Sequence, residues 1–165
     1  MEFDGMTREQ AVIWAAGFLD GEGTIRLENR PKFGAVMLEV QAVQVNPVPL
    51  LRLKALWGGS ISLQKMKPPF ADAYHWNVKG RSAIAICAEL LPYLTVKRRH
   101  AELAIEFGAV PSAAGKRISP ANHAEREVFR QMFSTLNKRG VSKPMADIGR
   151  PRAQRPQLRL ISEVS

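Results

Sequence analysis

Two segments of alternating apolar and polar residues, separated only by a short turn, restrict how this chain can fold. In residues 24–30, Ile25 and Leu27 alternate with polar side chains, and in residues 36–42 every second residue is Val, Leu or Ala. Such alternation places apolar side chains on one face of a strand and polar ones on the other. The "RPKFG" segment between them is typical of a turn. We therefore expect two neighbouring antiparallel strands. The alternation becomes irregular at residues 43–45, where a β-bulge would redirect Gln44.

The flanking segments predict helices and a second pair of strands. Thr7 and Gln10 form a capping-box pattern ahead of a helix over about residues 8–20. The remaining predicted elements are a helix from Pro49 to the Gly58–Gly59 stop, strands within 60–66 and 73–78, and helices over 81–91, 96–108 (with Thr95 as cap) and 120–139. This order indicates an α+β fold with a four-stranded antiparallel sheet. We expect one domain over residues 1–140, with its core at about 7–108 and a C-terminal helix at about 120–139. A basic, flexible tail is expected at 141–165.

The composition favours an intracellular protein with a polyanionic partner. The 165 residues include 24 Lys and Arg against 15 Asp and Glu, a formal charge of +9, which favours nucleic acid before an anionic membrane surface. A single cysteine, Cys87, excludes an intrachain disulfide and a thiolate zinc site. The longest apolar run, residues 11–19, is too short to span a bilayer, and no basic signal-peptide region precedes it. We therefore expect no membrane partner and a location in the cytoplasm or nucleoid.

The segment "WAAGFLDGEG", residues 14–23, combines glycines and acids at the end of a predicted helix. Gly17 and Gly21 share a helix face with Ile13, a spacing that lets a second helix approach closely. The alternative is that Gly17 packs against the chain's own sheet and that the acids only end the helix. Asp20 and Glu22 face the negative end of the helix dipole, which is unfavourable unless a cation offsets it. Mg²⁺ binds carboxylates together with phosphates and water, and two such helices at a two-fold axis would bring two carboxylates together.

Residues 15–23, "AAGFLDGEG", resemble the nine-residue signature of the LAGLIDADG homing endonucleases. The family's αββαββα order also fits the order predicted for residues 7–108, and "VQV", "GGSI" and "LLPYLTVKRRHAELA" are loosely similar segments outside the signature. The resemblance implies a site-specific double-strand DNA endonuclease that cleaves a long pseudo-palindromic target by metal-dependent phosphodiester hydrolysis. A chain with one such motif implies a homodimer with an isologous interface. No small-molecule cofactor is implied.

The resemblance also implies roles for individual residues. Glu22 corresponds to the catalytic metal-binding acid, more often Asp in the family, and would hold Mg²⁺ with its counterpart in the second subunit and the backbone of Gly21; Mn²⁺ or Ca²⁺ would substitute for binding. Gln44 matches a catalytic Gln that orders water, and Lys97 a catalytic Lys near the active centre. The alternatives are an ordinary polar sheet residue for Gln44 and a solvated Lys-Arg cluster for Lys97. The implied dimer interface comprises Ile13, Ala16, Gly17, Asp20 (a mainly structural acid) and Gly21.

Outward-facing polar residues of the predicted strands, with nearby basic residues, are the candidate DNA contacts. A curved antiparallel sheet fits the major groove, where Arg pairs with G, Gln with A, and Glu accepts from C. Basic residues outside the strands would contact phosphates. An ordinary solvent face would be polar as well. The set comprises Thr24, Arg26, Glu28, Arg30, Lys32, Glu39, Gln41, Ser62, Gln64, Lys65, His75, Asn77, Lys79 and Arg98.

Two other functions compete with cleavage. The resemblance also allows a non-cleaving nucleic-acid-binding protein, either a splicing maturase that binds intron RNA or a DNA-binding regulator. The presence of Glu22, Gln44 and Lys97 favours cleavage over these. A generic basic RNA-binding protein would give no reason for Gly17, Gly21 and Glu22 to occur together.

Overall fold

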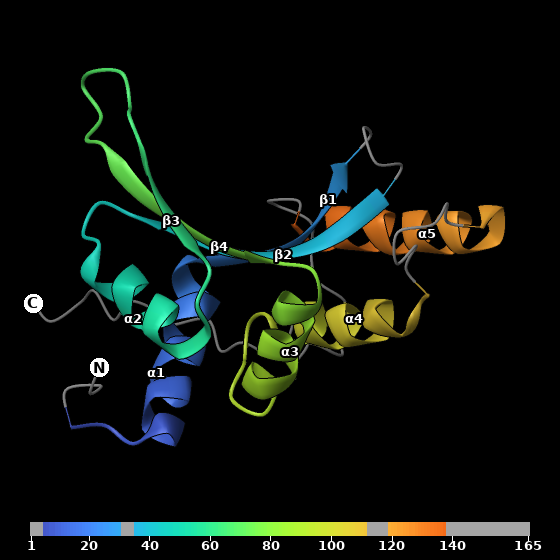
Figure 1. Ribbon diagram of the computed structural model, residues 1–165, viewed down its shortest axis with the longest axis horizontal. Helices are drawn as coiled ribbons and strands as arrows, with labels where there is room; N and C mark the ends of the chain where they lie inside the picture. Colours follow the sequence, from blue (N-terminus) through green and yellow to red (C-terminus); the bar gives the residue numbers. More distant parts are fainter. Residues whose placement is uncertain (1–4, 31–34, 112–118, 138–165) are drawn as a thin grey trace, which may run out of the picture.

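A four-stranded antiparallel sheet carries helices on one face and leaves its other face open (Figure 1). The computed structural model describes residues 5–30, 35–111 and 119–137. Within these ranges the strands lie in the order β1-β2-β4-β3, which confirms the predicted α+β fold. The elements are α1 (Arg8–Glu22), β1 (Gly23–Arg30), β2 (Ala35–Gln44), α2 (Val48–Trp57), β3 (Ser60–Gln64), β4 (Ala73–Lys79), α3 (Arg81–Leu90), α4 (Arg98–Ala109) and α5 (Pro120–Asn137). The predicted tail at 141–165 lies outside the described residues.

Helix α1 begins at the predicted capping box and runs directly into β1. The Thr7 side chain accepts a hydrogen bond from the Gln10 amide at 3.2 Å, and the Gln10 side chain accepts one from the Thr7 amide at 2.8 Å. The helix continues to Glu22, two residues beyond the predicted end. At Gly23 a Cβ atom would lie 2.7 Å from the carbonyl oxygen of Leu19. Only glycine therefore allows the helix to pass into the strand without a connecting loop.

Strand β2 pairs with β1 on one side and with β4 on the other in an uninterrupted register. Gly23 lies opposite Ala42, and the β2–β4 pairing continues through Gln44, which lies opposite Tyr74. The bulge predicted at 43–45 is therefore absent from the paired residues. Because the alternation is maintained, Gln44 falls on the same face of the sheet as Ala42.

The predicted apolar positions of the strands form the core with the helices. Leu38, Val40 and Trp76 are completely buried, and the Trp76 indole donates to the carbonyl of Gly58 at 2.9 Å. Cys87 is also buried, and burial raises the pKa of its thiol to about 12. Among the described residues, no helix combines the length and apolar character needed to cross a membrane.

The start of α4 is held by an acid from α1 and not by the predicted cap. The Asp20 carboxylate accepts hydrogen bonds from the backbone amides of Thr95, Val96 and Lys97 at 2.7, 3.1 and 2.8 Å. The helix begins at Arg98, and its N-cap residue Lys97 makes no side-chain capping bond. The prediction of Thr95 as a cap was wrong because a carboxylate distant in sequence binds the amides just before the helix.

Helix α5 packs beside α4 against β1 and β2 through one buried arginine. Arg126 donates to the carbonyls of Val110 at 2.9 Å and Val36 at 3.0 Å, and its guanidinium lies 4.1 Å from the centre of the Phe107 ring. The side chain is buried, so these bonds satisfy backbone carbonyls that water does not reach. Phe133 adds a fully apolar contact from the same helix.

We predict that Asp20→Ala loosens the start of α4 and destabilises the fold by about 2 to 4 kcal/mol, because three amides lose a charged acceptor. Urea denaturation measures the loss, and amide hydrogen exchange at residues 95–97 should accelerate. Asp72→Ala is the control, because Asp72 accepts one amide bond in an exposed loop, from Met66. Equal destabilisation by both substitutions would contradict the assignment.

We also predict that Arg126→Ala destabilises the protein by about 2 to 4 kcal/mol, since it leaves the carbonyls of Val36 and Val110 without their donor. Thermal and urea unfolding measure the effect. Arg130→Ala serves as the matched control on the same helix, because Arg130 pairs at the surface with Glu127. The control should unfold like the unmodified protein; a comparable loss in both variants would refute a special role for Arg126.

Candidate active site and nucleic-acid interface

The C-terminal end of α1 brings together two of the predicted site residues, Asp20 and Lys97. The Lys97 amine donates to the carbonyl oxygen of Asp20, while the Lys97 amide donates to the Asp20 carboxylate. A cation at this position offsets the negative end of the helix dipole. Lys97 is half-buried, so it is not simply a member of a solvated cluster. Asp20 is bonded within its own chain, as expected of a structural acid.

Glu22 is the last residue of α1 and is exposed. Within the described ranges its carboxylate makes no ion pair or hydrogen bond. The Asp20 carboxylate is satisfied by backbone amides nearby, so Glu22 is the acid of the motif that remains available to a ligand. No group of three His, Cys, Asp or Glu side chains in the described part of the chain could enclose a metal ion. Magnesium bound here would take its further ligands from water, phosphate or a second copy, which suits its preference for few protein ligands.

Gln44 lies at the same end of the sheet as Glu22. The register that pairs Gly23 with Ala42 brings the end of β2 next to the junction of α1 and β1. Gln44 is half-buried and follows Ala42 on the helix-bearing face of the sheet. The structure therefore places all three predicted catalytic residues around one end of α1.

One face of α1 is unusually open. A Cβ atom added at Gly17 or Gly21 would meet nothing within 4 Å, and the neighbouring Ile13 is 46% exposed. The alternative that Gly17 packs against the chain's own sheet is therefore wrong. Trp14 and Phe18 stack along the helix with ring centres 5.5 Å apart.

Two residues of the expected dimer interface are engaged within their own chain. Ala16 is completely buried in the core, because it lies on the helix face that packs against the sheet. It is therefore not available to a partner, and its inclusion in the interface was wrong. The Asp20 carboxylate is bound by the backbone of residues 95–97. The face that remains open consists of Ile13, Gly17 and Gly21.

The open face of the sheet is a grid of polar side chains in cross-strand rows. One row is Arg26, Glu39 and Lys79 on β1, β2 and β4. The next contains Thr24, Gln41, Asn77 and Ser60, where Ser60 bonds Asn77 at 3.0 Å. His75 lies one row further and contacts Gln41 at 2.9 Å. The predicted residues that share this face are Thr24, Arg26, Glu28, Glu39, Gln41, Ser62, Gln64, His75, Asn77 and Lys79.

The remaining predicted DNA contacts are placed differently. Arg98 lies in the first turn of α4, in the helix layer, and pairs with Glu102 at 3.4 Å. Lys65 follows β3 and is exposed. Arg30 ends β1, and Lys32 lies outside the described residues. Arg98 is thus separate from the grid formed by the strands.

Glu39 differs most from its predicted role. It occupies the expected face, but only 1% of it is exposed, because Arg26 and Lys79 cover its carboxylate. Both neighbours are bonded to it, so Glu39 is not an exposed acceptor for a cytosine amino group. Alternation alone gives the face of a residue but not the side chains that lie over it.

Sequence reasoning missed two features of the site. Ser60 belongs to the polar grid, and the alternation of "SISLQ" was sufficient to find it. The amides of residues 95–97 that bind Asp20 carry no local signal, because their acceptor lies 75–77 residues away in sequence.

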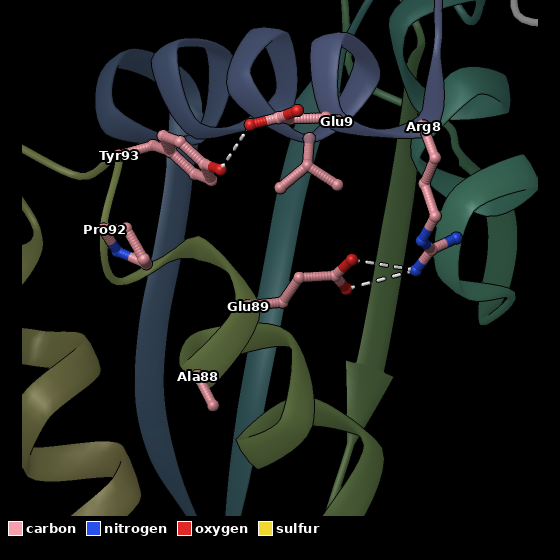
Figure 2. A pocket seen from close by; sticks show the side chains of 7 residues that line it. Arg8, Glu9, Ala88, Glu89, Pro92 and Tyr93 are labelled. Atoms are coloured by element: carbon pink, nitrogen blue, oxygen red, sulfur yellow. Dashed lines mark hydrogen bonds and ion pairs between the residues drawn. The ribbon is translucent and has the colours of Figure 1, made fainter.

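A pocket lies between the start of α1 and the end of α3, where polar side chains connect the two helices (Figure 2). Its lining includes Glu89, whose carboxylate accepts bonds from Arg8 at 2.9 Å and from the Trp57 indole at 2.7 Å. The Tyr93 hydroxyl donates to Glu9 at 3.4 Å. These polar groups bond one another, and at about 1.5 Å per helical residue Glu9 lies about 20 Å along α1 from Glu22. This pocket is therefore separate from the candidate active site.

Comparison with solved structures identifies the fold. The homing endonuclease I-CvuI in complex with its target superimposes with a TM-score of 0.64 and 20% identity, covering 86% of this chain and 90% of that chain. The archaeal intron-encoded homing endonuclease I-Vdi141I, complexed with DNA, gives a TM-score of 0.63 and 17% identity over 81% of this chain and 87% of that one. The I-SmaMI LAGLIDADG homing endonuclease bound to cleaved DNA gives a TM-score of 0.56 and 18% identity, and the match covers 72% of this chain but 42% of that chain.

No protein-family model and no curated protein matches the sequence. At these identities the likeness establishes the architecture, and it agrees with the helix and strand order read from the residues. The chain has the fold of the LAGLIDADG homing endonucleases.

Proposed function

We propose that this protein is a site-specific, divalent-metal-dependent DNA endonuclease that acts as a homodimer. The observation that carries the proposal is the arrangement at the end of α1. Glu22 is exposed and has no partner among the described residues, whereas the carboxylate of Asp20 is bound by amides of its own chain. The helix also presents an open glycine face. The similar I-CvuI and I-Vdi141I structures are of homing endonucleases bound to DNA, which supports this reading.

The residues at the end of α1 fit a magnesium ion. Glu22 offers a carboxylate and Gly21 a backbone carbonyl, and Mg²⁺ commonly uses one or two carboxylates together with substrate phosphates and water. When bound, the ion would activate a water molecule and stabilise the charge on the leaving oxygen. Mn²⁺ or Ca²⁺ would occupy the same ligands for binding.

Lys97 and Gln44 would act on the substrate from this chain. The Lys97 amine is held at the carbonyl of Asp20, two residues before Glu22. From there its positive charge would stabilise the phosphate as negative charge develops during hydrolysis. Gln44, at the end of β2, would hold a water molecule beside the scissile phosphate through its amide group.

The open face of α1 supports a second copy of the chain as partner. Packing within the described part of the chain does not require glycine at positions 17 and 21, because a Cβ there would meet none of its atoms within 4 Å. Glycine in a helix interior costs about 1 kcal/mol relative to alanine, so close approach of another helix gives it a physical reason. The match to I-SmaMI, which covers 42% of that chain, is consistent with two such units forming the complete site.

The polar grid of each subunit would read one half of the target. Two grids related by a two-fold axis recognise a long, pseudo-palindromic duplex. Arg26, Gln41 and Asn77 provide donors and acceptors suited to base edges. Lys65, which is exposed next to β3, would contact phosphates.

We predict that Glu22→Gln abolishes Mg²⁺-dependent cutting while DNA binding persists. Cleaved sites are first selected from a random duplex library, and the best site is then used in single-turnover assays. A metal ligand supplies several kcal/mol to the transition state, so cutting should fall by at least about 100-fold.

The control is Glu9→Gln, the same change on the first turn of the same helix, which should cut like the unmodified protein. Undiminished cutting by Glu22→Gln would refute the catalytic assignment. An unmodified protein that binds duplex DNA but cuts none of it with Mg²⁺ or Mn²⁺ would instead support the non-cleaving function.

We predict that Gly17→Leu yields a folded monomer. The added Cβ has no neighbour within 4 Å in the described part of its own chain, whereas a leucine side chain would block a second helix. Thermal stability of the monomer should therefore be maintained, while sedimentation should show half the mass. Ala85→Leu, at an exposed position of α3, should remain dimeric. A Gly17→Leu protein that sediments as a dimer would exclude the α1 face as the interface.

A further inference from the structure

A buried acid lies at the centre of the polar grid, where three strands meet. Glu39 on β2 faces Arg26 across one strand pair and Lys79 across the other. Its carboxylate is 1% exposed, whereas the side chains of Arg26 and Lys79 are 43% and 28% exposed. The two cations therefore form the part of this row that a ligand on the sheet would meet.

We propose that Glu39 is a positioning residue that holds Arg26 for recognition of one guanine in each half of the DNA target. This inference rests on the DNA-binding function proposed above. It assigns a base contact to Arg26 and excludes one for Glu39.

The bonds between Arg26 and Glu39 leave the edge of the Arg26 guanidinium that can bind guanine available. Both Nε and Nη2 of Arg26 bond Oε2 of Glu39, at 2.8 and 2.7 Å. A guanidinium has five N–H donors in a planar fork. Because Glu39 binds the edge formed by Nε and Nη2, the edge formed by Nη1 and Nη2 stays available, with one N–H on each nitrogen. These two parallel donors match the acceptors O6 and N7 of guanine.

The second oxygen of Glu39 is occupied as well. Lys79 Nζ lies 3.0 Å from Glu39 Oε1 and 3.0 Å from Glu28 Oε2. Burial tends to lower the pKa of Lys79, but its bonds to Glu28 and Glu39 outweigh burial and raise it. The ammonium stays charged at neutral pH, so the Glu39 carboxylate is fixed from both sides and cannot rotate away from Arg26.

Charge pairing favours base recognition by Arg26 and Lys79 over phosphate binding. Each of these two cations is already paired with an acid, Arg26 with Glu39 and Lys79 with Glu28 and Glu39, although the whole chain carries a formal charge of +9. A paired cation gains little from the phosphate backbone, whose attraction depends on unbalanced positive charge. Its remaining donors are directional, and Arg26 is already ordered before binding, so less side-chain entropy is lost when it meets a base.

The test compares three variants by selection of bound duplexes from a random library in Ca²⁺, with affinities then measured at several salt concentrations. Arg26→Lys keeps the charge but loses the fork, and Glu39→Gln releases Arg26. Glu125→Gln is the matched control, since it makes the same change at an exposed position of α5, outside the polar grid.

Arg26→Lys and Glu39→Gln should both lose selectivity for guanine at the same position of each half-site, by about 5- to 100-fold. Glu39→Gln should also bind unrelated DNA more tightly, with a steeper dependence on salt. Glu125→Gln should keep the guanine preference. A purely structural role for Glu39 predicts instead a uniform change at all sequences.

Several outcomes would overturn the inference. If Arg26→Lys keeps every base preference of the unmodified protein, Arg26 does not read guanine, and this result does not depend on whether Glu39→Gln folds. If the two variants lose preference at different positions, Glu39 does not act through Arg26. An unmodified protein that selects no duplex DNA would overturn the proposed function itself, which separates that failure from the failure of this assignment.

Discussion

The carboxylate of Asp20 fixes the geometry on which the candidate site depends. It joins the end of α1 to the backbone just before α4, across 75–77 residues of sequence. The same contact brings the Lys97 amine onto the carbonyl oxygen of Asp20. A carboxylate bound by three amides is electrostatically satisfied, so the negative charge available to a ligand at this helix end is that of Glu22. Two acids separated by one glycine thus have different roles because only one of them meets the amides of its own chain.

Helix α1 has a buried face, an open face and an exposed acid at its C-terminal end. Its small residues Ala11, Ala15 and Ala16 are buried against the core, which lets the helix lie close to the sheet. The face with Gly17 and Gly21 is open, and the C-terminal end carries the exposed acid. Glycine in a helix interior weakens an isolated helix, and no contact among the described residues requires glycine at these two positions. This is the observation that supports the dimer proposed above.

On the open face of the sheet, charged side chains pair with one another although the chain as a whole is basic. Arg26 and Lys79 are bonded to Glu39, and Lys79 also to Glu28. Hydrogen bonds within the grid order side chains that would otherwise be mobile, as in the pairs of Gln41 with His75 and of Ser60 with Asn77. Such preorganisation suits recognition of base edges, whereas attraction to phosphates depends on unbalanced charge elsewhere on the chain.

The amino-acid sequence alone determined the helices and strands, the polar face of the sheet and the residues around the end of α1. These features depend on local periodicity, a capping box and a short motif, all of which act between residues close in the chain. Tertiary structure decided the rest. Contacts between distant segments bury Glu39 and Ala16. Such contacts also place the Asp20 carboxylate on the amides of residues 95–97. The β2–β4 register likewise removed the expected bulge near Gln44. A local pattern gives the face of a side chain, but only packing determines which partner lies opposite it, and that partner determines whether a charge is neutralised or available for chemistry.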